Sequence, residues 1–511
     1  MIKGHATIDA TADYAFRYAP VAYVPLGRTG LKASQVGFGG YRISSGVSHH
    51  EKALSAAIRS GINLIDTSAN YADGGSETLV GQVLEDLTAS GELKRQQIIV
   101  ISKVGYLQGE NFALSQQRKC EGLPFQDLVE YSQGLEHCIH PEFIEDQLTR
   151  SLSRMKLETL DGYLLHNPEY YLGWAIKSGL SLESARIEYY RRIRAAFEYL
   201  EKEIEKGRIC FYGISSNTFP GTADDPEYTC LQTVWETAEA VSGEHHFGLA
   251  QMPFNLLEPG AVLEVNQPGG KSALSFAVEK GLGVLTNRPL NAFAAGRLLR
   301  LADLPQTERK ATSEVIEKIR QLQKSETRFW RKILPHLDIP PGLEVRLKQQ
   351  NEVGDNLKHY WKNFGSYENF RQAQKGMFWP RFEGVLNFLA PYGKENEELS
   401  RWLAYHPICL EEALDAVGSI YAEEAARVLN RIRYAVNDAD PEWEKQGTLS
   451  QKAIRALWST CGVSVILVGM RRDTYVEDVL SELKRPMEQK DRQGSWARLR
   501  QGTDELFRPS G

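Results

Sequence analysis

The chain has 511 residues, of which 42% are hydrophobic and 25% are charged, so it can bury a large globular core. Its formal net charge of −6 gives no general basic field, which argues against nucleic acid as a partner. The sequence has no signal-peptide pattern and no run of 18 apolar residues, and its six cysteines are widely spaced. We therefore expect a cytoplasmic protein with reduced thiols and no membrane span.

The chain begins with a polar segment and a short glycine-containing motif. Residues 1–20 show no periodicity, and we expect a loosely held tail there. In YVPLGRTGLKAS, Gly27 and Gly30 separate two short extended runs. This spacing predicts a β-hairpin, because glycine supplies the positive φ angles of a tight turn.

From residue 36 onward, short apolar runs alternate with helical patterns such as FIEDQLTRSLSRMKLE. The apolar runs are VGFG (36–39), INLIDT (62–67), IIVISKV (98–104), LDGYLLH (160–166), RICFYGIS (208–215), FGLAQMPF (247–254), GVLTNRP (283–289) and VSVILVGM (463–470). Eight buried strands joined by helices predict an α/β fold, a (β/α)8 TIM barrel. A doubly wound sheet would need a G-x-G-x-x-G loop after its first strand, and the sequence contains none.

Two long stretches interrupt this alternation. Residues 105–140 read as a long polar loop after the third strand, which we expect to shape the substrate pocket. Residues 300–447 carry long helical patterns and many aromatic side chains, which predict an all-α insertion between strand seven and the last helix and strand. The predicted domains are a tail (1–20), a barrel (21–299 with 448–490), a helical insertion (300–447) and a C-terminal tail (491–511).

Four side chains at the ends of the predicted strands have complementary chemistry. Asp66 and Tyr71 lie in DTSANY, Lys103 in ISKV and His166 in LLHNPE. In a barrel, the C-terminal ends of the strands share one rim, where active sites form. A free phenol has a pKa of about 10. We expect the Lys103 ammonium, held by Asp66, to lower that pKa, and His166 to bind the substrate oxygen. Tyr71 would then protonate a carbonyl oxygen as hydride reaches its carbon.

The same motifs, in the same order, resemble the aldo-keto reductase family. The resemblance covers the hairpin, DTSANY as D-T-x-x-x-Y, GGSETLVGQVL, the strand-three lysine and LDGYLLHNPE, across about residues 22–299 and 449–480. It implies that Asp66, Tyr71, Lys103 and His166 correspond to the catalytic tetrad. It also implies hydride transfer between NAD(P)(H) and an aldehyde, ketone, alcohol or sugar.

The resemblance also implies cofactor contacts at later strand ends. In GISSN, Ser215, Ser216 and Asn217 would hold the nicotinamide carboxamide together with Gln251, with the register of the two serines left open. TNRPL and VGMRRDTYVEDVL would supply further contacts, namely Asn287, Arg288, Pro289, Leu290, Gly469, Met470, Arg471, Tyr475 and Asp478. Asn287 stands where the family often has a stacking tyrosine. Arg288 replaces a serine and would reach the pyrophosphate. Arg471 and Arg472 favour NADP(H) over NAD(H).

Other interpretations remain open at this point. His137 and His140 flank Cys138, but no second cluster with ligand spacing accompanies them, and we predict no metal. The large insertion allows a cofactor-binding regulatory or scaffold protein that binds a protein partner. A lyase using Lys103 as a Schiff-base amine is a further alternative. The small-molecule carbonyl or alcohol substrate is not specified by the sequence.

Overall fold

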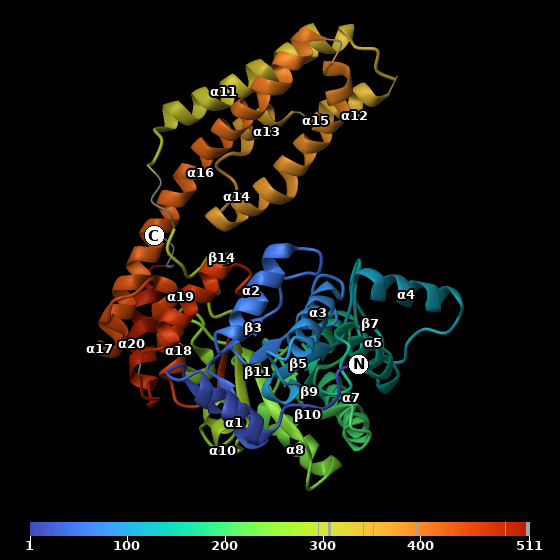
Figure 1. Ribbon diagram of the computed structural model, residues 1–511, viewed down its shortest axis with the longest axis vertical. Helices are drawn as coiled ribbons and strands as arrows, with labels where there is room; N and C mark the ends of the chain where they lie inside the picture. Colours follow the sequence, from blue (N-terminus) through green and yellow to red (C-terminus); the bar gives the residue numbers. More distant parts are fainter. Residues whose placement is uncertain are drawn as a thin grey trace. The chain divides into compact units, whose positions relative to one another are not determined.

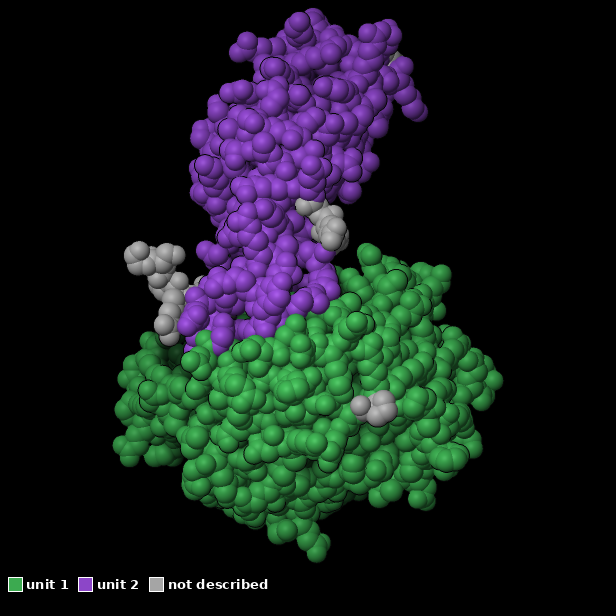
Figure 2. Space-filling model, turned by 90° about the vertical axis from the view of Figure 1, so that its left-hand side faces the viewer, with its two compact units in different colours: residues 1–290, 436–501 green, residues 291–435, 502–511 purple. Residues whose placement is uncertain are grey.

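The computed structural model describes residues 1–294, 296–304, 308–340, 342–350, 352–394, 396–485 and 487–506, which form two compact units (Figure 2). Unit 1 comprises Met1–Leu290 and Val436–Gln501. Unit 2 comprises Asn291–Ala435 together with the stretch that begins at Gly502. Among the described residues, no helix combines the length and the apolar composition that crossing a membrane requires.

Unit 1 is built on a closed barrel of eight parallel strands (Figure 1). The strands are β3 (Val36–Gly39), β4 (Leu64–Asp66), β5 (Ile99–Val104), β9 (Leu160–His166), β10 (Ile209–Ser215), β11 (Phe247–Pro253), β12 (Gly283–Asn287) and β15 (Val465–Val468). They are hydrogen-bonded in the order β10-β11-β12-β15-β3-β4-β5-β9. Each predicted apolar run contains one of these strands, so the predicted barrel is confirmed.

Helices cover the outside of the barrel (Figure 1). They include α2 (Ser48–Arg59), α3 (Gly75–Ala89), α5 (Pro141–Met155), α6 (Tyr170–Lys177), α7 (Leu182–Glu205), α8 (Leu231–Val241), α9 (Gly260–Leu263), α10 (Ala273–Glu279), α17 (Pro441–Glu444), α18 (Leu449–Trp458) and α19 (Asp473–Leu483). In α5, His140 accepts from the Glu142 N–H and Pro141 takes the first turn, where no amide donor is needed. Buried side chains then recur at helical spacing from Phe143 to Met155.

The predicted hairpin is present as β1 (Tyr23–Pro25) and β2 (Lys32–Ser34), joined through the 3-10 turn η1 (Gly27–Thr29). Leu26 and Leu31 belong to the same buried cluster as barrel residues such as Leu249. Gly27 has a φ of +51°, and a Cβ there would lie 2.2 Å from the Gly283 nitrogen. The hairpin therefore closes the end of the barrel at which β12 begins, and only glycine permits that approach.

The prediction of unstructured tails at the two ends of the chain is wrong for the residues that the structure describes there. Helix α1 (Ile8–Arg17) begins at Thr7, whose side chain accepts from the Ala10 N–H, and it buries Tyr14. Helix α20 (Gln493–Asp504) buries Trp496, whose indole donates to Thr460. Each segment buries few large side chains in a polar sequence, so apolar periodicity alone does not reveal the helix.

Residues 105–140, which were read as a long polar loop, contain regular secondary structure. The segment forms a three-stranded antiparallel sheet and a helix, namely β6 (Tyr106–Leu107), α4 (Gly109–Cys120), β7 (Val129–Ser132) and β8 (Leu135–His137). The order is β6-β8-β7. These strands have two to four residues, so their existence depends on pairing across the segment and not on a local pattern.

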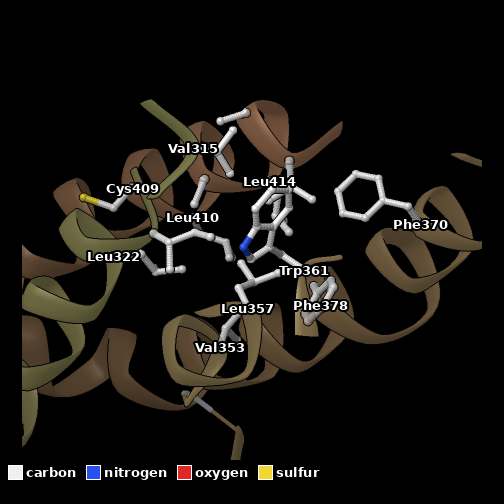
Figure 3. Close-up of a cluster of buried hydrophobic side chains, with 14 of the residues drawn as sticks. Val315, Leu322, Val353, Leu357, Trp361, Phe370, Phe378, Cys409, Leu410 and Leu414 are labelled. Atoms are coloured by element: carbon white, nitrogen blue, oxygen red, sulfur yellow. The ribbon is translucent and has the colours of Figure 1, made fainter. Parts of the chain in front are cut away.

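Unit 2 opens with a hairpin, β13 (Asn291–Ala294) and β14 (Arg297–Arg300), nearly all of which lies in residues that the sequence assigned to the barrel. Helices follow, namely α11 (Thr312–Arg328), α12 (Leu343–Gln350), α13 (Val353–Tyr360), α14 (Tyr367–Ala373), α15 (Trp379–Gly393) and α16 (Glu397–Ala439), whose last residues belong to unit 1. Trp361 lies among apolar side chains of α11, α13 and α16 (Figure 3). The helical unit therefore has a hydrophobic core of its own.

Candidate active site

Four side chains meet at the ends of three neighbouring strands. Asp66 ends β4, Lys103 lies in β5, and His166 ends β9. The Lys103 Nζ lies 2.7 Å from Asp66 Oδ2 and 3.2 Å from the Tyr71 hydroxyl. The rings of Tyr71 and His166 are 5.9 Å apart and nearly perpendicular. The structure thus brings together the four residues that were predicted to carry chemistry.

The hydrogen bonds continue from Asp66 across the barrel. Asp66 Oδ1 accepts from Gln251 Nε2 at 2.8 Å, and Gln251 Oε1 accepts from the Ser215 hydroxyl at 2.9 Å. One chain therefore runs from Ser215 through Gln251, Asp66 and Lys103 to Tyr71. Ser215 and Gln251, which were predicted to contact the nicotinamide, are thus linked to Tyr71 through Asp66 and Lys103, a connection between distant parts of the sequence that no local motif shows.

Burial sets the charge states at this site. Burial lowers the pKa of Lys103, but the Asp66 carboxylate and Tyr71 outweigh it, so the pKa is raised and the ammonium is kept. Burial raises the pKa of Tyr71 by more than the Lys103 ammonium lowers it. The expected net lowering of the Tyr71 pKa is therefore wrong. Tyr71 holds its proton at neutral pH, as a proton donor must.

His166 is neutral and is held from two sides by the segment 105–140. Burial and the Lys103 ammonium keep the pKa of His166 well below its usual value. The Nε2–H of His137 donates to the His166 carbonyl at 2.8 Å, which requires a protonated nitrogen there. The Tyr106 ring stands edge-on to the His166 ring at 4.7 Å, and its hydroxyl accepts from Asn167 Nδ2 at 2.6 Å. Neither His137 nor Tyr106 was predicted to support the site.

His137 and His140, which flank Cys138, have separate partners. His137 is committed to the His166 carbonyl, while the His140 ring caps α5. Among the described residues, one group with metal-ligand chemistry is His5, Asp161 and Cys210. The Asp161 carboxylate there is already paired with Arg95 at 2.8 Å.

The predicted nicotinamide contacts lie at the ends of β10 to β12. Ser216 is buried, with its hydroxyl 3.1 Å from Thr218 Oγ1, and Asn217 is exposed. The Asn217 N–H donates to Glu169 Oε1 at 2.8 Å. Burial raises the pKa of Glu169 to about 7, and sequence reasoning did not identify this residue. The Oδ1 atom of Asn287 is buried and has no hydrogen-bond partner among the described residues, so its hydrogen-bonding capacity is unsatisfied.

The remaining residues that were predicted to contact the cofactor differ in their hydrogen-bond partners and in their burial. Arg288 pairs with Glu258 at 2.9 Å, and Asp478 accepts from Ser450 at 2.7 Å and Gln451 at 2.9 Å. A Cβ at exposed Gly469 would meet no atom within 4 Å. The others are two buried residues, Pro289 and Met470, and three half-buried residues, Leu290, Arg471 and Tyr475.

A comparison with protein families identifies this arrangement. The model described as "Aldo/keto reductase family" matches residues 35–261. Residues 35–261 of the chain therefore belong to the aldo/keto reductase family. The matched range contains Asp66, Tyr71, Lys103, His166 and Gln251, so it covers the whole hydrogen-bonded chain described above.

Related proteins match parts of this chain. The NADH-specific methylglyoxal reductase of Escherichia coli is 30% identical over 151 residues, which are 28% of this chain and 41% of that protein. The L-galactose dehydrogenase of Arabidopsis thaliana is 28% identical over 205 residues, 38% of this chain and 57% of that protein. The chain thus spans about half the length of these relatives. A holo-form aldo-keto reductase structure from Bacillus halodurans aligns with a TM-score of 0.44 and 13% identity, covering 96% of this chain and 97% of that chain.

Proposed function

We propose that this aldo-keto reductase transfers hydride between NAD(P)(H) and a small carbonyl or alcohol, with Tyr71 as the general acid or base. The observation that carries the proposal is the position of the Tyr71 hydroxyl, 3.2 Å from the buried Lys103 ammonium. In reduction, the protonated phenol gives its proton to the substrate oxygen, and the ammonium stabilises the phenolate that remains. In oxidation, the same phenolate takes the proton back.

Asp66 and His166 would position other groups and would not transfer the proton themselves. Asp66 holds the ammonium at 2.7 Å and keeps it charged although it is fully buried. His166 is neutral, so it does not add a second positive charge beside Lys103, and its ring lies next to Tyr71. We assign it the role of orienting the substrate by a hydrogen bond. The buried Lys103 ammonium argues against the alternative of a Schiff-base lyase, which needs a neutral amine.

The groups at the rim fit a nicotinamide dinucleotide. The polar ends of β10, β11 and β12 offer Ser216, Asn217, Gln251 and the unpartnered Oδ1 of Asn287, which suit a carboxamide. We assign the phosphate groups to Arg471 and Arg472, with contacts from the neighbouring Gly469 and Tyr475. When bound, the cofactor supplies or accepts the hydride. We propose NADP(H) ahead of NAD(H) because two arginines suit a 2′-phosphate, although the Escherichia coli relative is named NADH-specific.

The names of the two relatives indicate small oxygen-rich substrates. One is a methylglyoxal reductase and the other an L-galactose dehydrogenase, so one acts on a dicarbonyl and the other on a sugar. We propose an aldehyde, ketone or sugar for this chain. A partner-binding role for residues 300–447 remains a secondary proposal, supported by the separate core of unit 2.

The test begins with binding. Fluorescence titration of the purified chain with NADPH and NADH measures both affinities, and a panel of aldehydes, ketones and sugars is then assayed for cofactor turnover. Tyr71→Phe is expected to lower kcat by about 10²–10⁴-fold with the cofactor Kd unchanged. Normal turnover by Tyr71→Phe on a verified substrate would contradict the mechanism.

A further inference from the structure

A buried carboxyl group connects the ends of two neighbouring strands at the proposed cofactor site. Glu169 follows β9, directly before helix α6, and is 3% exposed. Its Oε1 accepts from the backbone N–H of Asn217, just beyond β10, at 2.8 Å. Because the donor is a backbone N–H, the direction of this hydrogen bond is fixed. A carboxyl group thus holds the backbone of a residue that we assign to the nicotinamide.

The turn after β10 is also held by hydrogen bonds that do not involve Glu169. The Asn167 N–H donates to the Ser215 carbonyl at 2.7 Å, which joins the ends of β9 and β10. The Ser216 hydroxyl oxygen accepts from the Thr218 N–H at 3.1 Å. We therefore expect an isosteric replacement of Glu169 to leave this turn folded.

The negative charge of Glu169 would be only partly compensated. Its Oε2 is buried and has no hydrogen-bond partner among the residues that the structure describes. The Asn217 N–H and the Ser216 hydroxyl stabilise the carboxylate, and no lysine or arginine in the described part of the chain forms an ion pair with it. A buried carboxylate needs more donors, or a cation, to replace its lost water. Glu169 is therefore sensitive to a positive charge brought into the site.

The ionisable groups that face Glu169 belong to several elements. They are the Glu227 carboxyl before α8 and the phenols of Tyr106 in β6, Tyr170 in α6 and Tyr189 in α7. Burial raises the pKa of all three phenols, so they stay neutral around pH 7. Burial, with a smaller contribution from Glu227, raises the pKa of Glu169 to about 7. Glu169 therefore changes charge near neutrality while the phenols around it do not.

We propose that Glu169 is a positioning residue that makes the nicotinamide site respond to the redox state of the cofactor, because its carboxylate favours the oxidised form over the reduced form. This inference rests on the proposed function, since it takes Asn217 as a nicotinamide contact. The oxidised nicotinamide ring carries a positive charge and the reduced ring carries none. A poorly compensated carboxylate attracts that charge across a buried site, where Coulomb interactions are stronger than in water.

The sign of the pH dependence follows from this charge. Above pH 7 Glu169 is ionised, and below pH 7 it is neutral. We expect the Kd of NADPH divided by the Kd of NADP⁺ to rise by about tenfold from pH 6 to pH 8.5, as expected for one charge acting on another in a partly buried site. By linkage, NADP⁺ lowers the pKa of Glu169 and releases a fraction of a proton at pH 7, whereas NADPH does not.

The test is isothermal titration of the full-length protein with NADPH and with NADP⁺ across this pH range. Two buffers of different ionisation enthalpy give the proton release together with each Kd. Both cofactors carry the same phosphates, so ionisation of the phosphates cancels in the ratio, and NADH with NAD⁺ serves equally. Glu169→Gln keeps an oxygen for the Asn217 N–H but stays neutral. We expect its ratio to be independent of pH and close to the wild-type ratio at pH 6.

Glu227→Gln is the matched control, because it removes the carboxylate that faces Glu169 and leaves Glu169 in place. We expect the transition to remain, with its midpoint at a lower pH. A ratio independent of pH in wild-type protein, or an unchanged transition in Glu169→Gln, would overturn the inference and leave the proposed function standing. Failure of both cofactors to bind would contradict both. If Glu169→Gln did not fold, the wild-type proton release and the midpoint in Glu227→Gln would decide.

Discussion

Both units of this chain bury ionisable side chains, but Asp66 and Lys103 of unit 1 keep a charge that two buried groups of unit 2 lose. In unit 2, Glu326 accepts from the Gly354 N–H at 2.9 Å, and burial raises its pKa to about 8. His406 stacks on Trp402 at 4.4 Å, and burial lowers its pKa to about 3. In unit 1, Lys103 is equally buried, yet Asp66 keeps it charged and it reaches the hydroxyl of Tyr71.

The contrast separates two uses of a buried polar group. Glu326 and His406 are held in their neutral forms among apolar side chains, where they satisfy neighbouring backbone and side-chain atoms. Asp66 and Lys103 remain ions because each compensates the other, and their field acts on a group that can exchange a proton. A shifted pKa alone does not mark a reactive site. The candidate site differs because a retained charge lies beside the hydroxyl of Tyr71.

Replacement of Lys103 by methionine should have the largest effect, because it removes the charge on which unit 1 depends. We expect kcat to fall by about 10²–10⁴-fold, since the phenolate of Tyr71 loses its counter-ion. Asp66 is left buried and unpaired, which should cost roughly 3–5 kcal/mol in urea unfolding. The double variant Lys103→Met with Asp66→Asn should recover stability but not turnover. Recovery of turnover in the double variant would show that the charge is only structural.

Glu326→Gln tests the neutral buried acid of unit 2. The folded pKa of about 8 exceeds the usual 4.5, so the unfolded chain loses this proton first as pH rises. Wild-type stability should therefore fall between pH 4.5 and 8, by on the order of 5 kcal/mol from this group. The variant should lose that slope while its activity is unchanged. Glu317→Gln, a half-exposed position on the same helix α11, is the matched control in denaturant unfolding at pH 5 and 8.5.

Tyr106→Phe tests the support that the segment 105–140 gives to His166. Asn167 loses the acceptor that lies at 2.6 Å, which leaves a buried amide donor unsatisfied. We expect a loss of about 1–2 kcal/mol in unfolding free energy and a decrease in kcat of less than tenfold. Tyr131→Phe is the control, because its ring also packs on Tyr170 in this aromatic cluster. Equal effects of the two variants would contradict a specific role for Tyr106.

The smallest effect is expected at the proposed phosphate contact. Arg471→Met should weaken NADPH binding by roughly tenfold and NADH binding much less, because only NADPH carries a 2′-phosphate. Arg194→Met, on the exposed face of α7, controls for the loss of one positive charge. Isothermal titration with both cofactors gives the ratio of the affinities. An unchanged ratio would remove Arg471 from the phosphate site.

Regular repetition explains why the barrel and the meeting of its four candidate side chains were predictable. Each strand lies in a mostly apolar run of the sequence. Asp66, Lys103 and His166 lie at or near the C-terminal ends of strands, and in a (β/α)8 barrel these ends share one rim. The sheet at 105–140 was not predictable, because its strands depend on pairing between β6, β7 and β8 and have no pattern of their own. Helix α1 did leave a signal, the cap at Thr7 with Thr11 and Tyr14 on one face.

The direction of the pKa shift at Tyr71 depends on how deeply the side chain is buried, which the sequence does not show. The neighbouring ammonium predicts a lowered pKa, whereas the depth of burial decides the net direction. The contact between Ser68 and His166 was equally hidden, because the two residues lie 98 positions apart and nothing in DTSANY names a partner for the serine. Such contacts follow from the closed barrel and become visible only with it.

The position of the helical unit within the chain has a consequence for biosynthesis. Strand β15 joins β12 to β3, through pairs such as Leu285 with Val465 and Ile466 with Val36, and it is synthesised almost 180 residues after β12. Until it leaves the ribosome, β12 and β3 are open sheet edges with unpaired backbone groups, which invite association with other chains. The nascent protein must therefore synthesise Asn291–Ala435 of unit 2 before its barrel can close, and chaperone protection matters most during that interval.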